Sequence, residues 1–368
     1  MINLPDLRTA QVNDKKVFLR TDIDVPLSQQ TTNNKQQTTI ADDTRLRDSL
    51  ETLKYLLDNE AQVILAGHLG RPEGVDQKLS LKPIAQWFAE ELGIKNYDSR
   101  IKNLNGLDGF EISDKLFLLE NLRFNNGEES NPTTRSGQVF SKKLASLADI
   151  YVNDAFASSH RAHASVVGIA KLLPHYAGFM LEKEIDTLST LMDNPKRPLA
   201  VIIGGAKIET KLPLVEKMHE FADYVLVGGL IAEETKVLLK IQHEKVDPPV
   251  GGRKSALIVA DLVENETDIT SKDAENFLQI TNLAKTIVWN GPVGKTEGNE
   301  GNLEIGSAKI ARGIIDAGVY SVVGGGDTIG YLKKIGLLEK FSFVSTGGGA
   351  MLEFLSGEKL PGIEALTN

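Results

Sequence analysis

Short apolar runs alternate with helical repeats along most of the chain. In the second half, five such runs end in glycine-rich turns, at residues 199–207, 224–230, 286–294, 320–328 and 341–350. A β-branched run followed by glycine is typical of a buried strand whose end lets a ligand approach the backbone N–H groups. Ligands of open α/β sheets bind at the carboxyl ends of the strands. The pattern therefore predicts a site for a phosphate-bearing ligand, most simply a nucleotide.

The first half shows the same alternation. We predict strands at 16–19, 62–66, 116–119 and 150–152, and helices at 44–57, 80–92 and 140–147. Such alternation favours parallel pairing with right-handed crossovers. A helix at 181–192 is predicted to connect the two halves. The polar stretch 28–39 has no hydrophobic pattern, and we expect it to form an exposed, mobile loop.

Composition narrows the class of protein. The chain has 368 residues, more than a usual single domain, of which 41% are hydrophobic and 25% charged. Its net charge of −9 argues against a nucleic-acid partner, and the absence of cysteine excludes disulfides, thiolate metal sites and cysteine nucleophiles. No apolar run approaches the length of a membrane span, and residues 1–16 show no secretory pattern. We expect a cytoplasmic enzyme without a membrane partner.

Arginine and histidine gather in four motifs at predicted strand ends of the first half. The motifs are RTDIDVP (20–26), HLGRP (68–72), ENLRF (120–124) and SSHRAH (159–164). Arginine binds multi-oxygen anions bidentately, so Arg71, Arg123 and Arg161 together predict an anion pocket. For Arg20, an ion pair with a neighbouring aspartate is as good an interpretation as ligand binding.

Three other patterns give only weak evidence for a metal site, a P-loop or a dinucleotide site. His68, His160 and His163 lack the spacing of a familiar metal motif. TIVWNGPVGKT ends like a P-loop, but Trp289 occupies the position of its first glycine. In GGGDTIG, Gly330 comes one residue late for a dinucleotide fingerprint, which disfavours a dehydrogenase.

Taken in order, the motifs resemble one known family. RTDIDVP, HLGRP, LLENLRF, DIYVNDAFASSHRAHAS, GGAKIETK, WNGPVG, GGGDT, VSTGGGA and LPGIEAL cover most of the chain in the order seen in phosphoglycerate kinases. The resemblance implies an α/β fold of two doubly wound, Rossmann-like parallel-sheet lobes joined by a hinge helix. The implied bounds are 1–178 with a C-terminal return at 356–368 for the first lobe, 179–195 for the hinge and 196–355 for the second lobe.

The resemblance also implies a reaction, the reversible transfer of the γ-phosphoryl group of Mg-ATP to the carboxylate of 3-phosphoglycerate. The products would be ADP and 1,3-bisphosphoglycerate, as in glycolysis and gluconeogenesis. Because that carboxylate is already ionised at neutral pH, no general base is required, and positioning and charge neutralisation remain. The lobes would close around the two substrates and exclude water. We expect a monomer that uses ATP or ADP with Mg²⁺.

The resemblance also implies which residues bind the two substrates, the metal and the transferring phosphoryl group. 3-Phosphoglycerate would be held by Asp22, Asp24, Arg45, His68, Arg71, Arg123 and Arg161. The nucleotide would be held by Gly204, Gly205, Lys207, Lys211, Gly228, Gly229, Asn290, Pro292, Glu297, Gly324, Gly325, Gly326, Asp327 and Thr328. The transferring phosphoryl group would be stabilised by Arg45, Lys207, Lys211, Gly325 and Gly348. Asp327 would hold Mg²⁺, which prefers oxygen ligands, although a helix cap is an alternative role.

The chain departs from the family pattern at several positions. Asp24 stands where asparagine is usual, and because a carboxylate cannot donate a hydrogen bond, we expect it to pair with a basic neighbour. Lys295 and Thr296 replace residues that are usually apolar or aromatic near the nucleotide, and the stretch 233–278 is shortened. These departures leave the choice between ATP and GTP open. Two rival functions also stay open, namely a binding protein without turnover and a phosphotransferase for another small carboxylate.

Overall fold

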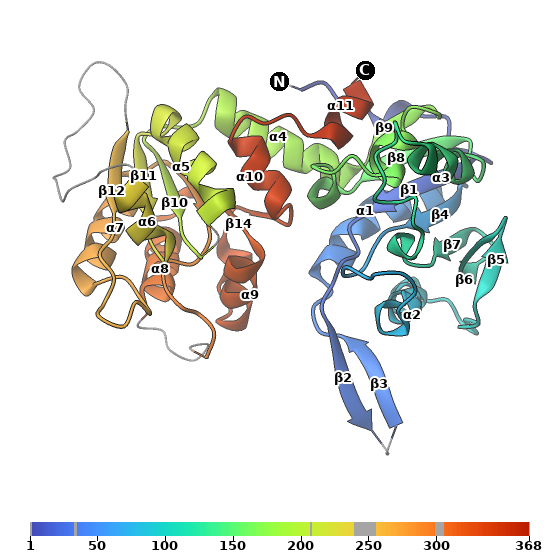
Figure 1. The fold of residues 1–368 in the computed structure, drawn as a ribbon, viewed down its shortest axis with the longest axis horizontal. Helices are drawn as coiled ribbons and strands as arrows, with labels where there is room; N and C mark the ends of the chain where they lie inside the picture. Colours follow the sequence, from blue (N-terminus) through green and yellow to red (C-terminus); the bar gives the residue numbers. More distant parts are fainter. Residues whose placement is uncertain (1, 33–34, 207, 239–254, 299–304, 368) are drawn as a thin grey trace. The chain divides into compact units, whose positions relative to one another are not determined.

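The chain divides into two units by its internal contacts. The computed structural model describes residues 2–32, 35–206, 208–238, 255–298 and 305–367. One unit comprises Ile2–Asp186 with Lys359–Asn368, and the other comprises Thr187–Glu358. The division falls within helix α4 (Phe179–Asp193), which therefore belongs partly to each unit (Figure 1).

The first unit is built on a seven-stranded sheet in the order β5-β6-β7-β4-β1-β8-β9. Its strands are β1 (Lys16–Thr21), β4 (Gln62–Ala66), β5 (Lys102–Leu104), β6 (Leu107–Ser113), β7 (Leu116–Leu119), β8 (Ile150–Asp154) and β9 (His175–Ala177). Strands β7, β4, β1, β8 and β9 pair in parallel. The carboxyl ends of these five strands consequently meet at one edge of the sheet.

Two antiparallel strands extend this sheet in a way that the sequence patterns did not predict. Strands β5 and β6 form a hairpin whose two turn residues, Asn105 and Gly106, have φ angles of 50° and 83°. Asn-Gly with a positive φ at both residues is the sequence expected of a type I′ hairpin turn. Strand β6 in turn pairs antiparallel with β7.

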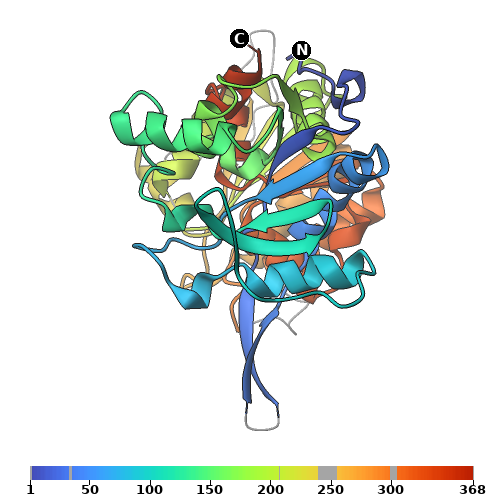
Figure 2. The same cartoon turned by 90° about the vertical axis from the view of Figure 1, so that its right-hand side faces the viewer.

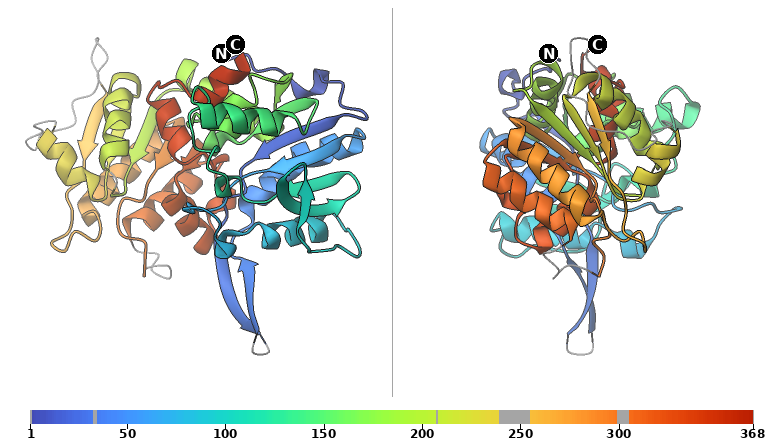
Figure 3. Two further views of the ribbon diagram at one scale, coloured as in Figure 1. Left: turned by 45° about the vertical axis from the view of Figure 1, so that its right-hand side comes forward. Right: turned by 90° about the vertical axis from the view of Figure 1, so that its left-hand side faces the viewer.

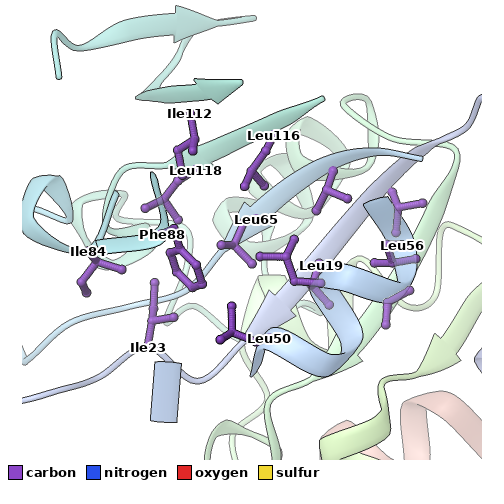
Figure 4. Close-up of a cluster of buried hydrophobic side chains, with 14 of the residues drawn as sticks. Leu19, Ile23, Leu50, Leu56, Leu65, Ile84, Phe88, Ile112, Leu116 and Leu118 are labelled. Atoms are coloured by element: carbon purple, nitrogen blue, oxygen red, sulfur yellow. The ribbon is translucent and has the colours of Figure 1, made fainter. Parts of the chain in front are cut away.

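Helices pack around the first sheet, and their buried side chains form the hydrophobic core together with those of the strands. They are η1 (Leu7–Thr9), α1 (Thr44–Asp58), η2 (Gln77–Leu79), α2 (Lys82–Glu91), η3 (Leu122–Phe124), α3 (Arg135–Ala145), η4 (Phe156–Ser158), η5 (Ala164–Gly168) and α11 (Pro361–Thr367). Leu19 and Leu65 of the sheet lie in one buried cluster with Leu50 of α1 and Phe88 of α2 (Figure 4). Helix α11 packs against η5, and the N–H of Gly362 donates to the main-chain oxygen of Ser159, which follows η4.

A polar hairpin projects from the first unit (Figure 2). It consists of β2 (Leu27–Thr32) and β3 (Lys35–Ile40), paired antiparallel from Leu27↔Ile40 onward. The expectation of a mobile loop at 28–39 is therefore wrong for the described residues. Leu27 and Ile40 pack against the core at the base, and the N–H of Ala41 donates to the oxygen of Pro26. These polar strands carry no hydrophobic alternation, so the sequence pattern did not predict a hairpin.

The second unit is built on a six-stranded, wholly parallel sheet in the order β12-β11-β10-β13-β14-β15. Its strands are β10 (Leu199–Ile203), β11 (Tyr224–Val227), β12 (Ala256–Val259), β13 (Thr286–Asn290), β14 (Tyr320–Gly324) and β15 (Phe343–Ser345). Five of them are the strands predicted from the glycine-terminated runs, and β12 is the exception. The doubly wound parallel architecture of this unit is confirmed.

Helices flank both faces of the second sheet (Figure 3, right). They are α5 (Ile208–Phe221), α6 (Ile231–Leu238), α7 (Ser271–Leu283), α8 (Gly306–Ala317), α9 (Gly326–Lys334), η6 (Leu338–Lys340) and α10 (Gly349–Leu355). Helices α7 and α8 pack together on one face, and α5 packs with α6 and α10 on the other. Among the described residues, no helix has both the length and the apolar character needed to cross a membrane.

Candidate active site

Each of the four basic motifs follows one of four neighbouring parallel strands of the first unit. Arg20 lies at the end of β1, His68 follows β4, Arg123 lies in η3 after β7, and Arg161 follows β8 and η4. Because β7, β4, β1 and β8 are adjacent in the sheet, the motifs converge at one edge. Arg45 joins them from the first turn of α1, where its Nη1 donates to the main-chain oxygen of Asp24 at 2.8 Å.

Arg20 is fully buried in a hydrogen-bond network. Its Nε donates to Ser165 Oγ at 3.0 Å, and its Nη1 donates to the oxygen of Thr21. Its Nη2 lies 3.2 Å from Ser158 Oγ and 3.0 Å from His68 Nδ1. Within the described residues Arg20 makes no ion pair with a neighbouring aspartate, and four of its five N–H donors have acceptors. The predicted ion pair with an aspartate is therefore wrong, and the hydrogen bonds of Arg20 connect β1 to Ser158, Ser165 and His68.

The two aspartates of the first motif are held by main-chain and hydroxyl donors. Asp22 accepts from the N–H of Ala157 at 2.7 Å and from Ser158 Oγ at 2.9 Å. Asp24 accepts from the N–H of Gly70 at 2.9 Å, and its second oxygen lies 3.8 Å from His68 Nε2. The basic side chain that faces the carboxylate of Asp24 is thus the imidazole of His68.

The histidines of this site are neutral. Burial, followed by the charge of Arg20, lowers the pKa of His68 well below its usual value. The same two causes lower the pKa of His163 to about 3, and burial and Arg161 lower that of His160. The positive charge of the site therefore comes from guanidinium groups, and His68 offers Asp24 no ion pair at neutral pH.

The arginines of this site differ in how many hydrogen bonds and ion pairs they make with other residues of the protein. Arg123 is almost fully buried; its Nε lies 2.9 Å from Glu129 Oε1, and its Nη1 donates to the oxygen of Gly70 at 2.6 Å. Arg71 and Arg161 are less buried, and neither side chain has a hydrogen bond or ion pair with any described residue. Their guanidinium groups are thus available to a bound anion, as an anion pocket requires.

A cavity of about 710 Å³ lies at the carboxyl ends of the strands in the second unit. It is lined by Gly205, Ala206, Gly229, Leu230, Asn265, Glu266, Thr267, Pro292, Gly294, Lys295, Thr296, Glu297, Gly326, Asp327, Gly330, Tyr331 and Lys334. Gly205, Gly229, Pro292, Glu297, Gly326 and Asp327 are among the residues predicted to bind the nucleotide. Lys295 and Thr296, two of the departures from the family pattern, line the same cavity.

The glycine pairs after β10 and β11 do not present free N–H groups. Gly204 donates to the oxygen of Asn290, Gly205 to that of Pro292, Gly228 to that of Ile203 and Gly229 to that of Val293. A Cβ on Gly229 would lie 2.7 Å from the nitrogen of Gly205 and 3.0 Å from the oxygen of Pro292. These glycines let three turns pack against one another and so shape the cavity wall.

The start of α9 carries the predicted metal ligand. Gly325, with φ 90°, is the N-cap, and Asp327 is an exposed acidic residue in the first turn. The cap position is therefore taken by Gly325, and Asp327 lines the cavity instead. Thr328 is buried and accepts from the N–H of Gly291 at 2.9 Å. The N-terminus of this helix adds positive potential beside Asp327.

Other predicted nucleotide residues lie behind the cavity. Asn290 is buried, with its amide nitrogen 3.8 Å from the sulfur of Met351, and it packs against Gly324 and Gly325. Gly348, with φ 54°, is the N-cap of α10. These positions support the turns that line the cavity without lining it themselves.

Of the two predicted lysines, one is described. Lys211 of α5 is buried, and its Nζ donates to the oxygen of Gly204 and, at 3.3 Å, to that of Asn290. Its ammonium group therefore sits beneath the turns after β10 and β13. Lys207, and with it the predicted helix face shared by the two lysines, lies outside the described residues.

Several lining residues were not singled out from the sequence. Tyr331 and Lys334 follow Asp327 by four and seven positions, so a helix beginning at GGGDT would have placed them on the same face. Residues 265–267 follow β12, and recognising ALIV as a strand would have directed attention to them. Asp268, just beyond, ties its loop to α8 by accepting from the N–H of Gly306 at 2.7 Å.

Comparisons with known proteins agree over almost the whole chain. A family model described as phosphoglycerate kinase matches residues 7–267 and 254–358. The chain is 38% identical to the chloroplastic phosphoglycerate kinase 1 of Arabidopsis thaliana, over 98% of this chain and 81% of that protein. It is 36% identical to the cytosolic phosphoglycerate kinase 3 of the same plant, over 98% and 97%. The chain belongs to the phosphoglycerate kinase family.

A solved structure extends this result to the fold. Phosphoglycerate kinase from Coxiella burnetii superposes with a TM-score of 0.75 at 30% identity, covering 99% of each chain. Family membership makes the protein a phosphotransferase, and it confirms both the resemblance drawn from the ordered motifs and the predicted two-lobed α/β class. The arginine-rich sheet edge and the glycine-lined cavity are thus the candidate substrate sites of a phosphoglycerate kinase.

Proposed function

We propose that this protein transfers the γ-phosphoryl group of ATP reversibly to the carboxylate of 3-phosphoglycerate, giving ADP and 1,3-bisphosphoglycerate. The observation that carries the proposal is a pair of guanidinium groups, those of Arg71 and Arg161, for which the described residues provide no hydrogen-bond or ion-pair partner. They lie at a sheet edge that already holds Arg45 and Arg123. Such an edge suits a small anion with two charged ends. Relatives named phosphoglycerate kinase support the choice of acceptor.

In the first unit, each side chain has a role suited to its surroundings. Arg71 and Arg161 bind oxygens of the substrate, and Arg123, braced by Glu129, adds fixed charge. His68 contributes a neutral donor, and Asp22, already held by two donors, orients the ligand rather than attracting it. Arg45 and Asp24 complete the predicted set.

In the second unit, the cavity at the strand ends takes the nucleotide. Glu297 serves the ribose hydroxyls, and Lys207 and Lys211 neutralise phosphate oxygens. The exposed carboxylate of Asp327 fits a hard cation, because it lines the cavity and is not used as a helix cap. Mg²⁺ bound with ATP supplies charge neutralisation at the phosphates. The chain's own task is to position the phosphates and exclude water.

The proposal also covers the hinge between the two units, the oligomeric state and the location in the cell. Helix α4 continues from one unit into the other and is the proposed hinge for closure. We propose a cytoplasmic monomer acting on small molecules. Its relatives include cytosolic and chloroplastic proteins.

The decisive assay measures ADP formation by the purified full-length protein with Mg-ATP and a panel of small carboxylic acids. We expect turnover with 3-phosphoglycerate and little with glycerate, which lacks the phosphate end. Tight binding of both substrates in calorimetry without turnover would favour the binding-protein alternative. Preference for another phosphorylated acid would favour the second alternative, and comparison of ATP with GTP would settle the nucleotide.

Replacing Asp24 by asparagine should lower KM for 3-phosphoglycerate about fivefold, because a partly exposed negative charge beside an anion costs on the order of 1 kcal/mol. Asparagine keeps an oxygen for the N–H of Gly70, and no ion pair is lost, since His68 is neutral. Steady-state kinetics should show KM for ATP unchanged. The matched control is Asp98→Asn, a surface aspartate paired with Arg100. An unchanged or raised KM would mean that Asp24 is compensated within the bound complex.

A further inference from the structure

Glu128 is a fully buried carboxylate with no role in the assignments above. It lies between η3 and α3, where its Oε1 accepts from the Ser165 hydroxyl at 2.6 Å and its Oε2 from the Ser165 N–H at 3.1 Å. Burial raises the pKa of Glu128, and the nearby charge of Arg20 acts in the opposite direction. A carboxylate without access to water requires donors and a counter-charge, and Ser165 and Arg20 supply them.

Ser165 gives this network a fixed direction. Arg20 Nε lies 3.0 Å from Ser165 Oγ, and a guanidinium group can only donate. The single hydroxyl proton of Ser165 must therefore go to Glu128. With Glu128 ionised, hydrogen-bond donation therefore runs from Arg20 to Ser165 and from Ser165 to Glu128.

The other end of Arg20 sets the proton on His68. Arg20 Nη2 lies 3.0 Å from His68 Nδ1, so this nitrogen must accept and the ring proton must sit on Nε2. Nε2 is the nitrogen that faces Asp24, at 3.8 Å from its carboxylate. A protonated Nδ1 would oppose the donor of Arg20, which agrees with the lowered pKa of His68.

The charged and titratable groups facing His68 come from every neighbouring element. They are Arg20 of β1, Asp24 after β1, Arg45 of α1, Arg123 of η3 and His163 before η5. The three arginines disfavour an imidazolium, and Asp24 is the single acid in this set. The surroundings therefore keep the ring uncharged, while Arg20 selects the tautomer.

We propose that Glu128 is a positioning residue of this kinase: through Ser165 it holds Arg20 against Nδ1 of His68 and thereby fixes His68 as a neutral Nε2–H donor to the substrate. The last step rests on the proposed function, because it takes 3-phosphoglycerate as the ligand that His68 faces. An unconstrained imidazole changes charge near neutral pH and can carry its proton on either nitrogen. The relay of hydrogen bonds from Glu128 through Ser165 and Arg20 to His68 fixes both the charge of the ring and the nitrogen that carries its proton.

The direct test observes the histidine ring in the full-length protein without substrates. Nitrogen NMR of protein carrying ¹⁵N-labelled histidine, with His68→Gln to assign the signal, should show a protonated Nε2 and a bare Nδ1. This state should persist from about pH 8 to about pH 5.5, whereas an ordinary histidine titrates near 6.5. A proton on Nδ1, or titration near the ordinary value, would overturn the proposal. The outcome does not depend on which substrate the enzyme uses.

Two variants test the role of Glu128 in catalysis. In Ser165→Ala, Arg20 loses its link to Glu128, so His68 should show mixed tautomers, and KM for 3-phosphoglycerate should rise about 5- to 20-fold for one lost hydrogen bond. Glu128→Gln keeps an acceptor oxygen for Ser165 but loses the negative charge, so it should show the same two changes to a smaller extent. The value of kcat and KM for ATP should stay within about twofold, because the change affects substrate binding alone. Ser49→Ala removes a buried hydroxyl from α1 and should alter neither readout.

Together, the NMR and kinetic results distinguish a failure of this proposal from a failure of the proposed function. If Glu128→Gln does not fold, Ser165→Ala carries the test alone. Wild-type NMR signals and KM in the folded variants would show that Glu128 is purely structural and would overturn the proposal. A shifted tautomer in a protein whose wild type does not phosphorylate 3-phosphoglycerate would instead overturn the proposed function and leave the relay intact.

Discussion

Replacing Arg45 by alanine should lower kcat about 10²- to 10³-fold, the range found when one group that stabilises transition-state charge is removed. Arg45 lies in the first turn of α1, and its Nη1 donates to the main-chain oxygen of Asp24 at 2.8 Å. A guanidinium group held in this way can stabilise charge that develops during transfer without first being reorganised. KM for 3-phosphoglycerate should rise less than kcat falls, because the interaction strengthens as the phosphoryl group moves.

Arg47 provides the matched control for this prediction. It lies on the same helix two residues later, with a side chain that is 55% exposed and paired with Asp43 and Glu91. Arg47→Ala should leave kcat within about twofold, because exposed ion pairs contribute little. Arg45→Lys, which keeps the charge but loses the fork, should fall between wild type and Arg45→Ala. Equal losses in Arg45→Ala and Arg47→Ala would show that the helix, rather than the charge, is responsible.

The strands of the second unit could be predicted because their information is local. Leu199–Ile203 and Thr286–Asn290 are continuous apolar runs ended by glycine, and a buried parallel strand produces that pattern. The hairpin of β2 and β3 could not be found in this way. Its register depends on backbone pairing between polar residues, which leaves no periodic signal.

The role of Arg20 shows a different limit of the sequence. Its partners Ser158, Ser165 and His68 lie 138, 145 and 48 positions away along the chain. Sequence patterns placed these residues at neighbouring strand ends, but they could not say which side chains point at a ligand and which satisfy one another. Burial decides this question, and it separates the fully buried Arg20 from the exposed Arg71.

The glycine pairs show the same limit in the second unit. Their presence after β10 and β11 correctly indicated where the cavity lies, because a ligand site forms at the strand ends. The expected reason was that their N–H groups would face the ligand. Those of Gly204, Gly205, Gly228 and Gly229 instead donate to carbonyl oxygens on neighbouring strands and turns. The partner of a backbone donor depends on the fold and cannot be derived from composition.

Replacing Asp327 by asparagine should lower kcat about 100-fold at a fixed, moderate Mg²⁺ concentration, an effect comparable to that of removing one electrostatic stabiliser. Asparagine keeps an oxygen at this position but loses the negative charge that a hard cation prefers. The Mg²⁺ concentration that gives half-maximal rate should therefore rise, and added Mg²⁺ should restore part of the activity. A helix cap would respond differently, because asparagine caps as well as aspartate does.

The control for Asp327 is Asp316→Asn, an exposed carboxylate near the end of α8 in the same unit. It should change neither kcat nor the Mg²⁺ dependence, since it lies outside the residues that line the cavity. Titrating Mg²⁺ against rate at saturating 3-phosphoglycerate compares the two variants directly. If Asp327→Asn lowers kcat while the Mg²⁺ curve stays in place, the carboxylate acts on the phosphates or on the helix and does not hold the metal. A curve shifted to higher Mg²⁺ concentration in Asp327→Asn alone would support its role as a metal ligand.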